Sequence, residues 1–267
     1  MADVMIVIPA RFASQRYPGK PLAPLRGKDG EAKSLIHRSW EAAMRVEGVS
    51  RVAVATDSQE IVDAVEGFGG EAIWTLPECR NGTERCAEVL GKLDAEPDLI
   101  VNLQGDAPLT PAYFVESLIE RMAADESAAV ATPVVRVSAS LYETLAADER
   151  KGIVGGTFAA TSGKGHAHYF SKRMIPHFAR DEVDDDKLPL LLHIGLYAYR
   201  PAALRAYVEH SPTALEQLEG LEQLRFLDMG APITVVEVAP PEWDIWELNN
   251  PSDVEHVENS LRIMGVS

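Results

Sequence analysis

The stretch that follows residue 8 gathers positive charge in a chain that is otherwise acidic. The formal net charge of the 267 residues is −16, yet residues 1–28 carry several Lys and Arg side chains and one acid, Asp3. Three of these cations, Arg11, Arg16 and Lys20, lie close together in the sequence. Guanidinium and ammonium groups bind phosphate oxygens through charge-assisted hydrogen bonds worth about 1.5–3 kcal/mol each. The pattern indicates a triphosphate site, with a solvated basic loop as the alternative.

A glycine and an aspartate fit the same chemistry. Gly19 would let the backbone come close to phosphates, although after Pro18 it also fits an ordinary turn. Asp106 follows an apolar stretch at residues 99–103, so its carboxylate would project from a strand end toward the α-phosphate. Magnesium prefers one or two carboxylates together with substrate oxygens. Asp106 is therefore the candidate metal ligand, and a turn-forming Asp after Gly105 is the alternative.

Short apolar segments and helical patterns must position these residues. Strands are predicted at residues 4–8, 51–55, 71–74, 99–103 and 128–134. Helices are predicted at residues 34–46, with Ser34 as the N-cap, and at residues 61–68. This alternation predicts an α/β fold with a Rossmann-like, mostly parallel sheet over residues 1–135 and helices on both faces. The cations then lie past the carboxyl end of the first strand, where such sheets bind ligands.

The pattern changes beyond residue 135. Shorter extended pieces at residues 152–160, 165–170 and 193–199 predict a smaller lobe, inserted at about residues 136–200 of one domain spanning residues 1–267. Because like charges repel, the acidic run DEVDDD at residues 181–186 predicts an exposed loop. An amphipathic helix at residues 215–227, a strand at 233–238 and a helix at 251–264 complete the prediction.

Composition excludes several classes of protein. The chain is 46% hydrophobic, enough to bury a sizeable core, and has no apolar run of the roughly 18–20 residues that cross a bilayer. With no signal peptide pattern either, we expect a cytoplasmic protein without a membrane span. The negative net charge argues against nucleic acid as a partner. Cys79 and Cys86 match neither a zinc pair nor a redox motif and are expected to be reduced structural thiols.

The first loop also argues against two other nucleotide-binding folds. No Gly-x-Gly-x-x-Gly follows the first strand, as a Rossmann dehydrogenase would require. A P-loop kinase is disfavoured because Pro21 follows Gly19 and Lys20 and the spaced upstream glycine is missing.

Motifs along nearly the whole chain resemble one family, the 3-deoxy-D-manno-octulosonate (Kdo) cytidylyltransferases. They are PARFASQRYPGKPL at residues 9–22, ATD at 55–57, GTER at 82–85, NLQGD at 102–106, YFS at 169–171, HIGLYAYR at 193–200 and LEQLR at 221–225. The resemblance implies a fold of the nucleotide-diphospho-sugar transferase type and transfer of CMP from CTP to an acidic 3-deoxy sugar, with release of pyrophosphate. It also implies Mg²⁺ as cofactor, a homodimer with its contact in the smaller lobe, and a product used in lipopolysaccharide synthesis.

The resemblance implies a role for each matching residue. Arg11 and Lys20 would grip the β- and γ-phosphates and stabilise charge on the leaving pyrophosphate, with Arg16 in support. Asp106 and Asn249 occupy the positions of the metal ligands. The implied catalytic residues are Arg11, Lys20 and Asp106; the nucleotide-binding residues are Ala10, Arg11, Arg16, Gly19, Lys20, Thr83, Arg85 and Gln104; and the sugar-binding residues are Gln104, Lys172, His193, Tyr197 and Glu222.

Three of the implied sugar-binding residues have distinct tasks. His193 would bind the sugar carboxylate or a hydroxyl, Tyr197 would pack against the sugar, and Glu222 would bind sugar hydroxyls. Taken without its motif, a histidine on an apolar strand fits a core histidine instead.

The metal ligands depart from the family's pattern. Ala107 stands where the family commonly has Glu, and Asn249 stands where a second metal carboxylate is expected. An amide oxygen can bind a hard cation but brings no charge. We therefore expect weaker magnesium affinity, or compensation by Glu247 or Asp244.

The sugar side departs as well. Lys172 replaces the usual arginine and loses its bidentate fork, and KGIVGG at residues 151–156 lacks the family's Val-Lys-Val. A related acid such as 8-amino-Kdo or a sialic-type sugar is therefore an alternative substrate. A nucleotide-sugar-binding paralogue without turnover is the non-enzyme alternative.

Overall fold

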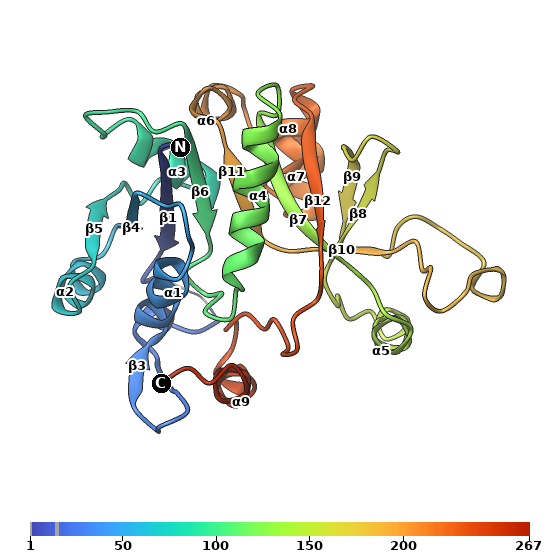
Figure 1. Cartoon of the computed structure of the whole chain (residues 1–267), viewed down its shortest axis with the longest axis horizontal. Helices are drawn as coiled ribbons and strands as arrows, with labels where there is room; N and C mark the ends of the chain where they lie inside the picture. The colour runs from blue at the N-terminus through green and yellow to red at the C-terminus, as the bar shows by residue number, and fades with distance from the viewer. Residues whose placement is uncertain (1, 14–15) are drawn as a thin grey trace.

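A computed structural model describes residues 2–13 and 16–267 (Figure 1), so Met1 and the Ser14 and Gln15 of the first-loop motif lie outside the described residues. One mixed ten-stranded sheet runs through the molecule in the order β5-β4-β1-β6-β11-β7-β10-β8-β9, with β12 paired to β7. Its strands are β1 (Val4–Ala10), β4 (Arg51–Thr56), β5 (Glu71–Trp74), β6 (Leu99–Leu103), β7 (Val130–Arg136), β8 (Thr157–Thr161), β9 (Ala167–Ser171), β10 (Leu191–His193), β11 (Leu196–Tyr199) and β12 (Ile233–Val238).

The remaining elements cover this sheet or join its strands. A separate hairpin is formed by β2 (Pro24–Arg26) and β3 (Ala32–Ser34). The helices are α1 (Leu35–Met44), α2 (Gln59–Gly67), α3 (Gly82–Leu90), α4 (Ala112–Ala124), α5 (Ala139–Arg150), α6 (Pro201–Glu209), α7 (Ala214–Glu219), α8 (Leu224–Asp228) and α9 (Val254–Ile263), with short 3-10 turns η1 (Lys20–Leu22), η2 (Arg180–Glu182) and η3 (Pro251–Asp253).

The parallel half of the sheet confirms the sequence-based prediction. β1 pairs in parallel with β4 and β6, and β4 pairs in parallel with β5. Alternate residues of β1 face opposite sides: Ile6 packs in the cluster that includes α1, α2 and α4, whereas Val7 packs in the cluster that includes α3, α6 and α8. Helices therefore bury both faces. The predicted N-cap is also confirmed, since the Ser34 hydroxyl accepts from the backbone N–H of His37.

The other half of the sheet corrects the prediction of a mostly parallel sheet that ends at residue 135. β11 pairs antiparallel with both β6 and β7, and β10, β8 and β9 continue antiparallel beyond β7. The predicted lobe at residues 136–200 consequently gives its last strand, β11, to the middle of the main sheet. α5, β8 and β9 lie at one end of the sheet (Figure 1). Strand order depends on long-range pairing, which local patterns do not record.

The predicted continuous helix at residues 215–227 is also wrong. α7 ends at Glu219 and is capped by Gly220, which adopts the left-handed conformation with φ 64°, and α8 begins at Leu224. Glycine adopts this conformation without the steric cost of a Cβ. The leucine repeat continues across this break, but Leu218 is 83% exposed. The spacing of the leucines by three to four residues therefore does not correspond to one buried face of a single helix.

Several smaller predictions can be compared with the structure directly. The acidic residues of the 181–186 run are exposed, as expected. Cys79 and Cys86 are free and buried, and burial raises the pKa of both thiols. Within the described part of the chain, no helix is long and apolar enough to cross a membrane.

Candidate active site

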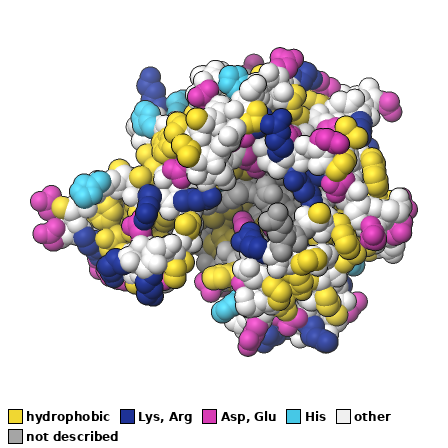
Figure 2. All heavy atoms as spheres, turned by 180° about the vertical axis from the view of Figure 1, so that it is seen from behind, with side chains coloured by type: hydrophobic (Ala, Val, Ile, Leu, Met, Phe, Trp, Pro, Cys, Tyr) yellow, Lys and Arg dark blue, Asp and Glu magenta, His cyan; other side chains and the backbone are white. Residues whose placement is uncertain are grey.

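A cleft opens at the carboxyl ends of the parallel strands. Its volume is about 260 Å³, and it is bounded by the loop after β1, the loop after β6 and the N-terminal end of α3. Of the predicted residues, Ala10, Arg11, Lys20, Gln104 and Asp106 line it. Figure 2 shows Lys and Arg side chains around the middle of one face of the molecule. The topology thus brings together the cations and the carboxylate that the sequence separates.

Lys20 and Asp106 form the central ion pair of the cleft. Lys20 Nζ donates to Asp106 Oδ2 at 2.6 Å, and the two side chains remain partly exposed. Gly19, in the left-handed conformation with φ 68°, caps the η1 turn that begins at Lys20. The turn interpretation of Gly19 is therefore confirmed. Its approach to phosphate stays a prediction.

Arg11 is held at the wall of the cleft by the backbone. One of its terminal nitrogens donates to the carbonyl of Cys79, in the loop that leads to α3. Partial burial and the positive charge of Arg85 lower the pKa of the Arg11 guanidinium. Arg11 remains a cation, since guanidinium pKa values stay far above neutrality. A ligand with negative charge would relieve the repulsion between the two guanidinium groups.

The segment that carries Asn249 is attached to Asp106. The backbone N–H of Leu248 donates to the Asp106 carbonyl at 3.0 Å. On one side of Leu248, Asn249 Oδ1 accepts from Arg16 at 3.2 Å; on the other, Glu247 Oε2 accepts from Asn249 Nδ2 at 3.4 Å. Arg16 and Asn249, 233 positions apart in the sequence, thus lie in contact, and their phosphate and metal roles stay predictions.

The negative charge of Asp106 acts on the Glu247 carboxyl. The surrounding protein, which displaces water, and the negative charge of Asp106 raise the pKa of the Glu247 carboxyl to about 7. The Glu247 side chain is exposed, so water is displaced from it only in part. The negative charge of Asp106 is therefore an important cause of the raised pKa. The two carboxylates are close enough to repel each other.

The donor set fits magnesium. Asp106, Glu247 and Asn249 present oxygen atoms, which are the ligands of hard cations, and the ammonium of Lys20 already holds positive charge against Asp106. Among residues 2–13 and 16–267, no group of three or more His, Cys, Asp or Glu side chains is arranged to hold a metal.

Gln104 is oriented by a buried asparagine. Its amide Nε2 donates to Oδ1 of Asn102, which is fully buried on β6. Gly82, the first residue of α3, passes so close that a Cβ there would lie 2.8 Å from Asn102 Nδ2. The absence of a side chain at residue 82 therefore lets α3 approach β6 beside Gln104.

Two predicted nucleotide-binding residues lie behind the cleft wall. Thr83 and Arg85 are fully buried. The Thr83 hydroxyl is bonded to the Tyr199 hydroxyl at 2.8 Å, and the Arg85 guanidinium is bonded to Thr75 and to Asp57 at 3.3 Å. Both side chains are buried and bonded to other residues of the chain here, and their direct contacts with nucleotide stay a prediction. Both side chains lie on the buried face of α3, and the GTER motif alone does not show which face of the helix each residue occupies.

Glu222 lies on the same inner side. Its carboxylate accepts from the backbone N–H of Thr83 at 2.9 Å, at the N-terminal end of α3 where such donors are free. Burial raises the pKa of the Glu222 carboxyl. Glu222 is partly exposed, so a hydroxyl of a ligand can still reach it.

His193 and Tyr197 belong to the core of the sheet. His193 is 9% exposed, its Nε2 is bonded to the Thr132 hydroxyl at 2.9 Å, and burial lowers its pKa to about 3. A neutral imidazole offers no charge to a sugar carboxylate, so the structure supports a core histidine. The Tyr197 ring packs against His193, and its buried hydroxyl donates to Gln223.

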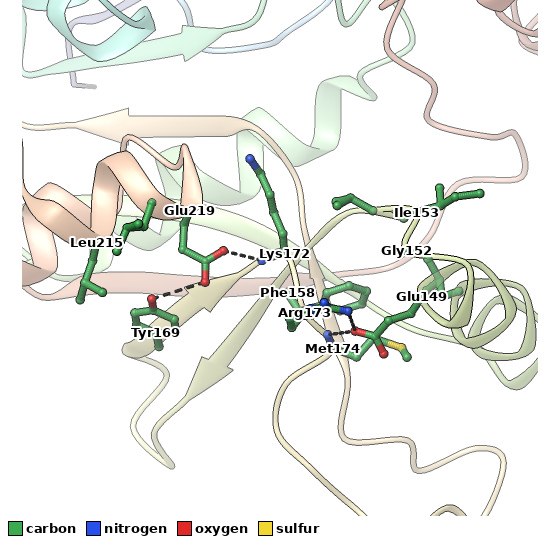
Figure 3. Close-up of a pocket in the computed structure, with 14 residues that line it drawn as sticks. Glu149, Gly152, Ile153, Phe158, Tyr169, Lys172, Arg173, Met174, Leu215 and Glu219 are labelled. Atoms are coloured by element: carbon green, nitrogen blue, oxygen red, sulfur yellow. Dashed lines mark hydrogen bonds and ion pairs between the residues drawn. The ribbon is translucent and has the colours of Figure 1, made fainter.

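Lys172 lines a different cavity, of about 490 Å³, at the end of the sheet near β8 and β9 (Figure 3). There Glu219 accepts from the backbone N–H of Lys172 at 3.1 Å and from the hydroxyl of Tyr169. The cleft that holds Arg11 and Asp106 is the smaller of the two. We assign the site by the convergence of cations and carboxylates, and the structure does not bring Lys172 into it.

Sequence reasoning missed the two polar side chains of the cleft that are contributed by Arg80 and Asn81. Arg80 is exposed at its edge, and Asn81 caps α3 by accepting from the backbone N–H of Glu84. An asparagine three residues before a glutamate is a recognisable N-cap signal, so Asn81 could have been found from the sequence.

Three comparisons place the chain among known proteins. The model of the family described as "Cytidylyltransferase" matches residues 5–233. The 3-deoxy-manno-octulosonate cytidylyltransferase of Maricaulis maris is 42% identical over 98% of each chain, and that of Chlamydia felis is 40% identical over 96% of this chain and 92% of its own.

Solved structures agree with these relatives. The structure of CMP:2-keto-3-deoxy-manno-octonic acid synthetase complexed with CTP is similar to this chain with a TM-score of 0.82 and 35% identity, over 97% of this chain and 98% of that one. The 4-diphosphocytidyl-2C-methyl-D-erythritol synthase of Anaerococcus prevotii, at 12% identity and a TM-score of 0.60 over 98% and 99% of the two chains, shares the fold alone.

Proposed function

Because this chain belongs to the family of 3-deoxy-manno-octulosonate cytidylyltransferases, we propose that it transfers CMP from CTP to the anomeric hydroxyl of Kdo. The hydroxyl oxygen forms a bond to the α-phosphorus, and the bond from that phosphorus to the bridging oxygen of the β-phosphate breaks. The products are CMP-Kdo and pyrophosphate, and the hydroxyl proton passes to solvent.

One observation of the site carries the proposal. The Lys20–Asp106 pair and Arg11 line one cleft at the carboxyl ends of β1 and β6. Arg11 and Lys20 can contact the same ligand and stabilise the negative charge on the leaving pyrophosphate. Because both cations are already in position, they do not have to move during the reaction. Lys20 exchanges Asp106 for phosphate oxygens when the nucleotide binds.

The metal of this reaction would be held by Asp106 and Asn249. Bound there, magnesium would polarise the phosphate oxygens and neutralise their charge. The described residues contribute the rest: Arg16 lies against Asn249, where it can bind phosphate, and Asp106 keeps the carboxylate charge beside Lys20.

The acceptor sugar is proposed to bind between Gln104 and Glu222. Gln104 lines the cleft, and Glu222 lies at the first turn of α3. The amide and the carboxylate suit sugar hydroxyls. Thr83 and Arg85 act as positioning residues, since Thr83 anchors Glu222 and Arg85 adds positive charge behind Arg11.

The test is pyrophosphate release from CTP and Mg²⁺ with Kdo, 8-amino-Kdo or N-acetylneuraminate as acceptor, for the unmodified chain and for Asp106→Ala. Release with Kdo that disappears in Asp106→Ala is expected. Release with another acid alone would change the sugar and keep the chemistry. CTP binding without release would show a paralogue without turnover.

The homodimer and the cytoplasmic location remain predictions. In support of a dimer, four large apolar side chains are 47–83% exposed in the region of the larger cavity, and patches of this kind mark protein contacts. They are Ile153, Val154, Leu215 and Leu218.

A further inference from the structure

Glu247 is fixed beside Asp106 by the backbone. The Leu248 N–H that donates to the Asp106 carbonyl at 3.0 Å is the peptide group that joins Glu247 to Leu248. The Glu247 carboxylate also lies near Gln104: a Cβ on Gly195 would be 3.7 Å from Glu247 Oε1 and 3.8 Å from Gln104 Cγ. Glu247 therefore lies close to Gln104 and next to the peptide group that is bonded to Asp106, two residues that line the cleft.

Asn249, two residues after Glu247, brings no negative charge to the metal site. Asn249 is an amide, and its oxygen already accepts from Arg16 at 3.2 Å. The Asp106 carboxylate is paired with Lys20, so these two side chains together carry no net charge. When the nucleotide binds and Lys20 moves to the phosphates, a divalent cation held only by Asp106 and Asn249 would have one charged ligand, and affinity for hard cations depends on the number of charged ligands.

We propose that Glu247 is the second carboxylate of the metal site in this chain and replaces the charge that Asn249 lacks. The inference rests on the proposed function and concerns which residue completes its metal site. Glu247 is solvent-exposed, its carboxylate offers oxygen ligands, and it lies against Asn249, whose Nδ2 donates to Glu247 Oε2 at 3.4 Å. Asp244, the acid nearest to Glu247 in this segment, is exposed three residues earlier, whereas the peptide group bonded to Asp106 is adjacent to Glu247.

The experiment measures metal binding without turnover. CTP affinity is determined by calorimetry in MnCl₂ and in EDTA, and the ratio of the two affinities gives the coupling between metal and nucleotide. The variants are Glu247→Gln, Asn249→Asp, the double variant Glu247→Gln with Asn249→Asp, and Asp244→Asn. Glu242→Gln, the same substitution at an exposed site five residues away, is the matched control.

We expect Glu247→Gln to reduce the coupling at least about tenfold, since loss of a group that only orients a metal ligand already costs about 10–100-fold in metal affinity. The double variant should recover most of the loss, because it returns one carboxylate to the site. Glu242→Gln and Asp244→Asn should leave the coupling unchanged.

Two outcomes would overturn the proposal: loss of coupling in Asp244→Asn alone, or unchanged coupling in Glu247→Gln. The second outcome can come with tighter CTP binding in EDTA. That combination would show that Glu247 merely repels the triphosphate. Thermal unfolding of each variant separates misfolding from loss of a ligand. Pyrophosphate release by the unmodified chain tests the proposed function separately, so the two ideas can fail independently.

Discussion

Lys20 is the cation whose position the structure explains most directly. It begins the η1 turn after Gly19 and reaches Asp106 across 86 positions of sequence. Its ammonium is available to phosphate because its side chain is 14% exposed and its partner is 26% exposed. The pair therefore belongs to the wall of the cleft rather than to the core.

Replacing Lys20 by methionine tests its role toward the leaving pyrophosphate. Lys20→Met keeps the length of the side chain and removes the charge. We expect kcat for pyrophosphate release to fall about 10²–10³-fold, as for the loss of one donor to developing charge. Steady-state kinetics with CTP and Kdo measures it. Lys28→Met, at an exposed lysine nearby, is the control, and equal activity of both variants would contradict the role.

His193 predicts a dependence of stability on pH. Burial lowers its pKa in the folded state to about 3, whereas the unfolded chain binds a proton near 6.5. The unfolded state therefore binds more protons below pH 6.5, and stability falls as the pH falls from 7 toward 3. At pH 5 the cost is about 2 kcal/mol.

Denaturant unfolding of the unmodified chain and of His193→Gln at pH 7 and pH 5 measures this cost. The variant is expected to be less stable at pH 7, because it loses ring packing with Phe170 and Tyr197. The difference in the free energy of unfolding should shrink by about 2 kcal/mol at pH 5. An unchanged difference would mean that His193 is not held neutral.

At the scale of elements, the N-terminal end of α3 and strand β6 set the shape of the cleft. A Cβ at residue 82 would lie 2.8 Å from Asn102 Nδ2 and 3.3 Å from Gln104 Nε2. Since interiors are close-packed, one of these amides would have to move. The position of Gln104 thus depends on how closely a helix and a strand approach.

Gly82→Ala is expected to reduce kcat/KM for Kdo at least about tenfold, because small misplacements of binding groups are costly. Gly91→Ala, at the other end of α3, places its Cβ no closer than 3.5 Å to another atom and serves as the control. Kinetics with Kdo as the varied substrate measures the effect. A Gly82→Ala enzyme as active as Gly91→Ala would show that Gln104 tolerates the added methyl group.

At the scale of the whole molecule, exposed apolar side chains gather at the end of the sheet that carries β8 and β9. Leu218, at 83%, is among the most exposed of the large apolar residues. Its burial in a dimer would contribute hydrophobic free energy of about 1.5–3 kcal/mol. This makes Leu218 the residue of choice for testing the predicted homodimer.

Leu218→Asp is expected to shift the chain from dimer to monomer, because the interface would have to bury a charge. Sedimentation equilibrium over a range of concentrations measures the change. Met44→Asp, an exposed apolar residue on α1, should leave the assembly unaltered. If the unmodified chain is monomeric at every concentration, the predicted homodimer is wrong.

The sequence by itself determined the features that local pattern records. The strands of the parallel half, the Ser34 cap, the exposed acidic run and the cationic first loop could all be predicted, because side-chain period and capping chemistry act over a few residues. The family could also be predicted, from motifs spread along the chain.

Only the tertiary structure decided which of these residues meet. It inserted β11 between β6 and β7, turned Arg85 and His193 into the interior with polar partners, and placed Lys172 in another cavity. It also joined the segment of Glu247 to Asp106 by a backbone hydrogen bond. The physical reason is that burial and long-range pairing depend on which faces of distant elements come together, and no short window of sequence contains that information.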